Sequence, residues 1–287
     1  MSFAVFADGT ANLPGRLLDG IRLLPSSYTM NGTPLVYTGD IEHFDTKAYY
    51  DDLRRGAVVK TSLLNTALFI ENFEPVLEEG KDVIYIAMSS GISGTYNAAY
   101  SAASQLMEEH PGRLVHIVDS HGCGFGNGML ALRAAKLNSE GLPAARASII
   151  LDNMVRHCCQ YFTVDDLNFL KRTGRVSGAT AAIGTTLNIK PILYGDQTGH
   201  IVSCGISRGR KRAIRKLADK YAEKRMNIPS PQVFISHGDC FEDAEALKAM
   251  ILEISPDANI TVCPHEPFSG AHVGPGMLGL FFAGIER

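Results

Sequence analysis

The sequence predicts a two-domain α/β protein, with an N-terminal three-layer α/β/α domain on a mainly parallel sheet and a C-terminal domain on a mixed sheet. Three observations support this prediction. The 287 residues are 45% hydrophobic and 20% charged, which is typical of a globular chain long enough for two cores. Apolar strands alternate with amphipathic helices in the first half. In the second half, six predicted strands accompany two predicted helices, which favours a mixed sheet.

The first half has the strand-helix alternation of a parallel sheet. Apolar runs predict strands at residues 3–7, 83–87 and 114–118, and helical periodicity predicts helices at residues 65–79, 96–109, 126–139 and 143–156. The Asn31-Gly32 pair predicts a type I′ hairpin over residues 28–38. We expect this hairpin to cap the edge of the parallel sheet.

The second half predicts strands at residues 161–164, 188–193, 200–206, 232–236, 260–263 and 278–285, with helices that begin near Gly209 and Phe241. We place the domain border between residues 160 and 161, so that the domains are 1–160 and 161–287. The sequence has no repeat and no low-complexity linker, which indicates that the two domains pack closely.

Composition excludes several classes of protein. The net charge of -3 argues against bulk attraction to nucleic acid or to an anionic membrane. The first residues lack the pattern of a signal peptide, and the apolar stretch at 277–285 is far shorter than the roughly 20 residues of a membrane helix. The six cysteines show no CxxC pair and no zinc-ligand spacing. We therefore expect a soluble cytoplasmic protein with free, mostly buried thiols and no metal.

The most informative segment is Ser-Ser-Gly-Ile-Ser-Gly-Thr-Tyr at residues 89–96, between a predicted strand and a predicted helix. Free backbone N–H groups at a helix start favour a carboxylate or a phosphate. Ser93 or Thr95 can add a hydroxyl donor. The alternative, that these hydroxyls only cap the helix, stays open.

The same segment also begins a hydrolase motif. Gly91-Ile92-Ser93 starts the G-x-S-x-G nucleophile elbow, but Thr95 stands where the closing glycine belongs. No second motif identifies the histidine and acid that such a serine requires. A serine esterase that uses Ser93 is therefore the rival function.

A glycine cluster at residues 122–128 suggests a dinucleotide-binding turn but fails its G-x-G-x-x-G fingerprint, because Asn127 and Met129 occupy the third glycine positions. A tight turn that allows close packing is the preferred interpretation. The sequence also has no P-loop or kinase motif for Mg²⁺ and nucleotide phosphates. We therefore expect a chain that is not a complete enzyme.

Residues 269–276 hold His272 between glycines, and we interpret them as too irregular for a plain helix. Such backbone freedom suits close approach to a ligand, although an isolated histidine is often structural.

Nine of the 27 basic residues lie at 208–225, where Ile214 and Leu217 begin an apolar face at helical spacing. This basic helix is either a solvated face or a docking site for an acidic or phosphate-bearing partner. A weaker rival is a nucleic-acid-binding regulator.

Taken together, these segments resemble the DegV family over nearly the whole chain. The matching motifs are Phe-Ala-Asp-Gly-Thr-Ala-Asn-Leu at 6–13, Lys-Thr-Ser at 60–62, Ser-Ser-Gly-Ile-Ser-Gly-Thr-Tyr at 89–96, Val-Asp-Ser at 118–120, the run 170–193 with Gly-Arg-Val-Ser at 174–177 and Ile-Lys-Pro at 189–191, Arg-Gly-Arg at 208–210, His-Gly at 237–238 and His-Val-Gly-Pro-Gly at 272–276. The sequence departs from the family at Gly9, at residues 63–65 and at Thr173. The changes at 63–65, next to Thr61, leave the acyl-chain specificity open.

The resemblance implies a two-domain DegV-type fold that holds a long-chain fatty acid between its domains. It implies a non-catalytic carrier in phospholipid metabolism, without a cofactor, that presents the fatty acid to an ATP-dependent kinase subunit of the dihydroxyacetone-kinase type. Transient membrane contact is compatible with this role. By resemblance, the carboxylate is bound by Thr61, Ser93 and His272, the head-group region is supported by Gly94, Thr95 and Gly270, and the kinase is contacted through Arg175, Arg208 and Arg210.

Overall fold

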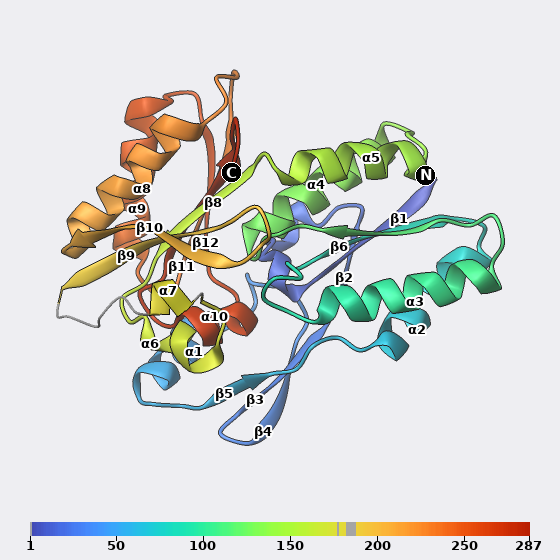
Figure 1. Ribbon diagram of the computed structural model, residues 1–287, viewed down its shortest axis with the longest axis horizontal. Helices are drawn as coiled ribbons and strands as arrows, with labels where there is room; N and C mark the ends of the chain where they lie inside the picture. Colours follow the sequence, from blue (N-terminus) through green and yellow to red (C-terminus); the bar gives the residue numbers. More distant parts are fainter. Residues whose placement is uncertain (1, 177, 182–187) are drawn as a thin grey trace.

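The computed structural model describes residues 2–176, 178–181 and 188–287. Two α/β lobes, each built on its own sheet, lie side by side, and a small third sheet projects from them (Figure 1). Ser177 of the Gly-Arg-Val-Ser motif and residues 182–187 of the 170–193 run lie outside the described residues. No helix in the described ranges is both long and apolar enough to cross a membrane.

The first lobe contains a four-stranded parallel sheet in the order β2 (Ile21–Leu24), β1 (Phe3–Asp8), β6 (Asp82–Ala87) and β7 (Val115–Asp119). Every residue of β1 is buried, because helices cover both faces of the sheet. One face packs against α4 (Phe125–Ser139) and α5 (Ala144–Val155), and the other against α2 (Thr66–Glu78) and α3 (Thr95–Glu109). The three predicted layers are confirmed, and β2 is an additional strand that we did not predict.

The second lobe contains a six-stranded mixed sheet. Its order is β10 (Ile201–Arg208), β9 (Ile189–Gly195), β8 (Cys158–Thr163), β13 (Leu278–Ala283), β11 (Gln232–His237) and β12 (Asn259–Pro264). Only the β11–β12 pair is parallel among these described strands. The predicted domain border between residues 160 and 161 falls within β8. On one face lie α8 (Arg210–Lys224) and α9 (Phe241–Ile254), and the predicted apolar stripe of α8 is buried there.

The predicted hairpin forms, but its placement was wrong. β3 (Ser26–Met30) and β4 (Thr33–Tyr37) pair across Asn31 and Gly32, whose φ angles of 51° and 85° suit a type I′ turn. The hairpin pairs with β5 (Val59–Thr61) in a separate sheet instead of joining the parallel one. The edges of the parallel sheet are formed by β2 and β7. The aromatic side chains of the hairpin pack instead on α1 (Thr46–Arg54).

The prediction that residues 269–276 are too irregular for a plain helix was wrong for residues 269–273, which lie in the helix α10 (Pro267–Val273). The backbone is irregular only after it, where Gly274 and Gly276 have positive φ angles. Pro267 occupies the first turn of α10, and the side chain of Glu266 accepts hydrogen bonds from the N–H groups of Phe268 and Ser269. The glycine within the helix, Gly270, permits close packing, since an added Cβ would lie 2.6 Å from the Tyr50 hydroxyl. The remaining short elements are η1 (Gly9–Ala11), η2 (Gly15–Leu17), α6 (Asn168–Thr173) and α7 (Gly178–Ala181).

Candidate functional site

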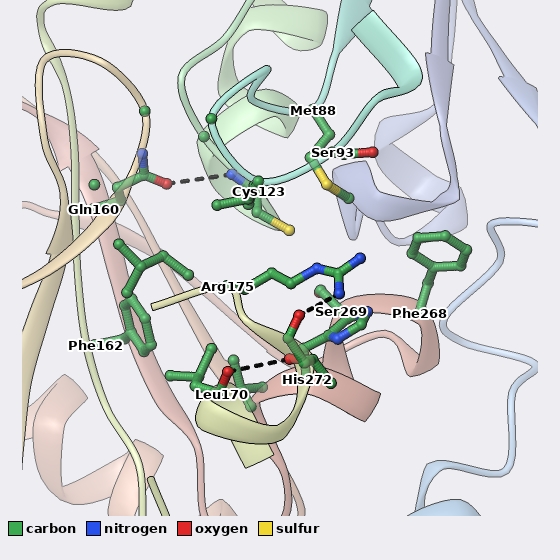
Figure 2. Close-up of a pocket in the computed structure, with 18 of the residues that line it drawn as sticks. Met88, Ser93, Cys123, Gln160, Phe162, Leu170, Arg175, Phe268, Ser269 and His272 are labelled. Atoms are coloured by element: carbon green, nitrogen blue, oxygen red, sulfur yellow. Dashed lines mark hydrogen bonds between the residues drawn. The ribbon is translucent and has the colours of Figure 1, made fainter. Parts of the chain in front are cut away.

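A cavity of about 420 Å³ lies between the two lobes. The first lobe lines it with the loops that follow β6 and β7, and ligands of parallel α/β sheets bind at such strand ends. The second lobe contributes parts of β8, α6, α10 and β13. Figure 2 shows side chains from these elements converging on one space. The volume lies within the range of ordinary small-molecule sites.

Thr61 and His272 meet at the wall of this cavity, although 211 positions separate them in the sequence. The Thr61 Oγ1 atom and the His272 Nε2 atom are 2.9 Å apart. Burial, with a smaller contribution from the charge of Arg175, lowers the pKa of His272 to about 4. The imidazole is therefore neutral at pH 7. Its Nδ1 atom is buried and has no hydrogen-bond partner among the described residues.

Ser93 lines the same cavity from the loop between β6 and α3. Its hydroxyl accepts a hydrogen bond from the Thr95 N–H (3.2 Å) and donates one to the Thr95 hydroxyl (3.0 Å). The Ser93 hydroxyl thus contacts the N–H of the first residue of α3, but Gly94 occupies the cap position and no side chain makes a cap hydrogen bond there. Gly94 also lines the cavity, whereas Thr95 is buried behind it. Within the described part of the chain, no histidine hydrogen-bonds to Ser93, so the pairing that a serine esterase requires is not observed there.

Arg175 lies in the cavity, which the sequence did not indicate. It follows Gly174, whose φ of 68° ends α6 in the left-handed conformation and directs the chain inward. Its guanidinium donates to the Thr173 carbonyl, and Figure 2 shows the side chain reaching into the centre of the space, toward His272. A cationic group thus faces the Thr61–His272 pair.

The other predicted site residues lie outside the cavity. Arg208 is exposed at the end of β10. Arg210 is mostly buried, with its Nε atom 2.8 Å from an Asp243 oxygen and Nη1 3.6 Å from an Asp165 oxygen. Gly270 contacts Tyr50, as described above.

The apolar part of the lining comes mainly from the second lobe. Residues 277–281 alternate between cavity and core, as extended backbone directs successive side chains to opposite faces: Met277 and Phe281 line the cavity, whereas Leu278 and Leu280 lie in the core. The apolar side chains around the space are Leu63, Met88, Ile92, Phe162, Leu170, Ile201, Phe268, Val273, Met277 and Phe281. Sequence reasoning missed most of these, because a buried apolar residue has no local signal that separates cavity wall from core.

Glu266 holds α10 in place from a fully buried position. Besides capping the helix, its carboxylate accepts a hydrogen bond from the Ser269 hydroxyl, and its backbone N–H donates to Asn12 Oδ1 at 2.7 Å. His265 Nε2 lies 2.8 Å from the same serine hydroxyl. The contact with Asn12, which follows η1, joins the second lobe to the first, and the other contacts support the helix that carries His272.

The burial of Glu266 has a consequence for stability. Desolvation raises the pKa of its carboxyl from 4.5 to about 7, against hydrogen bonds that lower it. Because the folded-state pKa is raised, the associated stability is fully present below pH 4.5 and is lost as pH rises through 7. Glutamine cannot ionise, so we compare the unfolding free energy of Glu266→Gln with that of the native chain at each pH. We expect the variant's value minus the native value to rise by about 3 kcal/mol between pH 4 and pH 8.

Urea unfolding at several pH values measures this difference. The opposing titrations of His265 and His272 are present in both proteins, so they cancel in the comparison. A difference that stays constant with pH would contradict the assigned ionisation of Glu266.

Among the described residues, no group of three or more histidine, cysteine, aspartate or glutamate side chains is arranged to hold a metal ion. The described cysteines are free, and three of the six are buried. The glycine cluster at 122–128 allows close packing, as interpreted: an added Cβ on Gly126 would lie 2.5 Å from the side-chain oxygen of Gln160.

Comparison with known proteins agrees with this architecture. The family model described as "Uncharacterised protein, DegV family" matches residues 2–284. A DegV domain-containing protein of Clostridium perfringens is 34% identical over 286 residues, which cover 99% of this chain and 98% of that protein. A fatty-acid-binding DegV family protein from Thermus thermophilus is 29% identical, with a TM-score of 0.86 and coverage of 99% and 100%. DegV of Bacillus subtilis, a fatty acid binding protein, is also 29% identical, with a TM-score of 0.82 and 99% coverage of both chains. The chain therefore belongs to the DegV family.

Proposed function

We propose that this protein binds one long-chain fatty acid in the cavity between its lobes. The observation that carries the proposal is the composition of the cavity, where apolar side chains surround a polar group made of Thr61, His272 and Arg175. Such a combination suits a ligand with a long apolar tail and an anionic end. The fatty-acid-binding relatives from Thermus thermophilus and Bacillus subtilis support it.

The carboxylate end needs donors, because an ionised group removed from water without partners is very costly. Arg175 supplies a positive charge, and the N-terminus of α3 next to Ser93 supplies partial positive charge. The neutral His272 has one N–H. When its Nε2–H donates to Thr61 Oγ1, the threonine O–H is free to donate to the carboxylate. On this proposal the imidazole acts on the carboxylate through Thr61.

The tail supplies most of the affinity. An acyl chain of about 16 carbons gains roughly 0.8 kcal/mol per buried CH₂, on the order of 12 kcal/mol before ordering costs are subtracted. Phe162, Phe268 and Phe281 offer aromatic surface for this contact. Head-group contacts then fix the orientation of the ligand.

We also propose that the protein acts as a fatty-acid carrier for a separate ATP-dependent kinase of the dihydroxyacetone-kinase type. A partner must reach the carboxylate, and its phosphate-bearing site would be attracted by exposed cations. Arg208 and the solvent-facing residues Lys211, Arg212, Arg215 and Lys216 of α8 form a cationic surface on the second lobe. Arg210 is held by Asp243 and Asp165, so it would support this surface rather than contact a partner directly.

Organic extraction of the purified protein, followed by mass spectrometry, tests the proposal. We expect close to one fatty acid per chain, and acyl phosphate on addition of ATP and the kinase subunit but not with either component alone. Recovery of a water-soluble metabolite, or of no ligand together with no binding of added fatty acid, would overturn the proposed function.

A further inference from the structure

The side chain of Arg287, the last residue of the sequence, lies at the boundary between the lobes. Only 9% of the residue is exposed. The guanidinium donates hydrogen bonds to the carbonyls of Ser120 (3.2 Å) and His121 in the turn between β7 and α4. Burying a guanidinium is costly unless its donors are used. The two Nη atoms use these carbonyls and so hold the position of the turn, whereas the buried Nε atom has no hydrogen-bond partner among the described residues.

Gln160 of β8, in the second lobe, hydrogen-bonds to the same turn. Its Nε2 atom donates to the His121 carbonyl at 2.7 Å, and its Oε1 atom accepts from the Cys123 N–H at 3.3 Å. Gly195 of β9 packs against both side chains, since an added Cβ there would lie within 2.8 Å of the Gln160 amide and of the Arg287 guanidinium. Two side chains of the second lobe thus fix one turn of the first.

The same turn also hydrogen-bonds to the loop that contains Ser93. The Ser89 N–H donates to the Gly122 carbonyl at 2.9 Å, and the Ser90 N–H donates to Asp119 Oδ1 at 3.1 Å. The Ser93 N–H then donates to the Ser89 carbonyl at 3.1 Å. Hydrogen bonds, together with the short backbone segment 119–122, therefore connect Arg287 to the Ser93 loop.

We propose that Arg287 is a positioning residue for carboxylate recognition, which it serves by fixing the 119–123 turn and, through it, the Ser93 loop at the cavity. This inference rests on the proposed function. Arg287 does not touch the ligand on this proposal. Its loss would therefore affect the head-group contacts more than the burial of the acyl tail.

The test compares the affinity of the full chain for palmitic acid with its affinity for palmitic acid methyl ester, which has the same tail without the charge. We expect the native protein to prefer the acid by at least tenfold, and we expect Arg287→Met to remove most of this preference. Arg287→Lys, which keeps a donor, should restore part of it. Arg146→Met, at an exposed arginine of α5, is the matched control and should leave the preference unchanged.

The preference is informative because a general loss of stability would weaken the acid and the ester alike. An unchanged preference in folded Arg287→Met would overturn the inference while leaving the proposed function intact. If the native protein bound neither ligand, the proposed function itself would fail. Should Arg287→Met not fold, Arg287→Gln keeps a polar side chain that is shorter than arginine, and an unchanged preference in that folded variant would overturn the inference.

Discussion

Replacing Thr61 with valine is expected to weaken the binding of a long-chain fatty acid by roughly 100-fold, or about 3 kcal/mol. Valine keeps the shape of threonine and removes only the hydroxyl. The carboxylate loses a donor, and His272 loses the one hydrogen bond that orients it. Because the Nδ1 atom of this histidine has no partner among the described residues, the whole imidazole would then be buried without one. Titration with a fluorescent fatty acid and competition with the native ligand measure the effect.

Thr29→Val is the matched control. Thr29 lies on β3 of the same small sheet, next to Tyr28, which pairs with Thr61, so pleating directs its side chain to the other face. We expect this variant to bind normally.

Ser93→Ala and His272→Gln should also weaken head-group fixation, and all three site variants should slow acyl-phosphate formation more than they reduce folding stability. Equal phosphorylation of the native and Ser93→Ala carriers would contradict the assigned head-group role.

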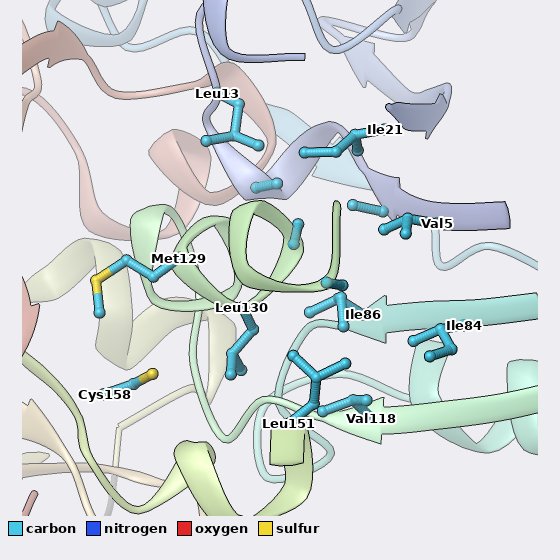
Figure 3. Packing of buried hydrophobic residues seen from close by; sticks show 14 of the residues in the cluster. Val5, Leu13, Ile21, Ile84, Ile86, Val118, Met129, Leu130, Leu151 and Cys158 are labelled. Carbon is cyan, nitrogen blue, oxygen red and sulfur yellow. The ribbon is translucent and has the colours of Figure 1, made fainter. Parts of the chain in front are cut away.

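The second large effect concerns Gly128 of α4, the helix that follows the cavity-lining residues Gly122 and Cys123. An added Cβ at Gly128 would lie 2.4 Å from the backbone oxygen of Ala11 and 3.2 Å from a methyl of Leu13. Figure 3 shows Leu13 opposite α4 in this packed cluster. A backbone oxygen cannot rotate away, so Gly128→Ala would force α4 from η1 and is expected to lower the unfolding free energy by about 3 kcal/mol. That cost exceeds the roughly 1 kcal/mol that alanine gains in helix propensity.

Chemical denaturation of Gly128→Ala and of Gly178→Ala provides the comparison. An added Cβ on Gly178 meets no heavy atom of the described residues within 4 Å, so that variant should be as stable as the native protein or slightly more so. Displacement of α4 should also weaken ligand binding, because Gly122 and Cys123 just before it line the cavity. Normal stability of Gly128→Ala would show that the glycine cluster does not serve close packing.

Local signals predicted the first lobe well. Each of its predicted strands and helices agrees with the structure to within one residue at either end, because hydrophobic periodicity and turn residues act over a few neighbouring positions. Asn65, for example, caps α2 with its side chain, as its place before an apolar helical pattern suggests. The glycines around His272 misled the prediction in part. Gly270 serves contact with Tyr50 inside α10, whereas Gly274 and Gly276 have φ angles of 77° and 76° and form irregular backbone after the helix.

The sequence by itself determined the alternation of strands and helices, the two-lobed α/β class, and the three residues that match the head-group motifs of the family. Only the tertiary structure decided that Thr61 touches His272, that Arg175 enters the cavity, and that Arg287 reaches the turn behind the Ser93 loop. The physical reason is range. Helical and strand patterns depend on adjacent residues, whereas contacts across 167 or 211 positions exist only after both lobes have folded and packed together.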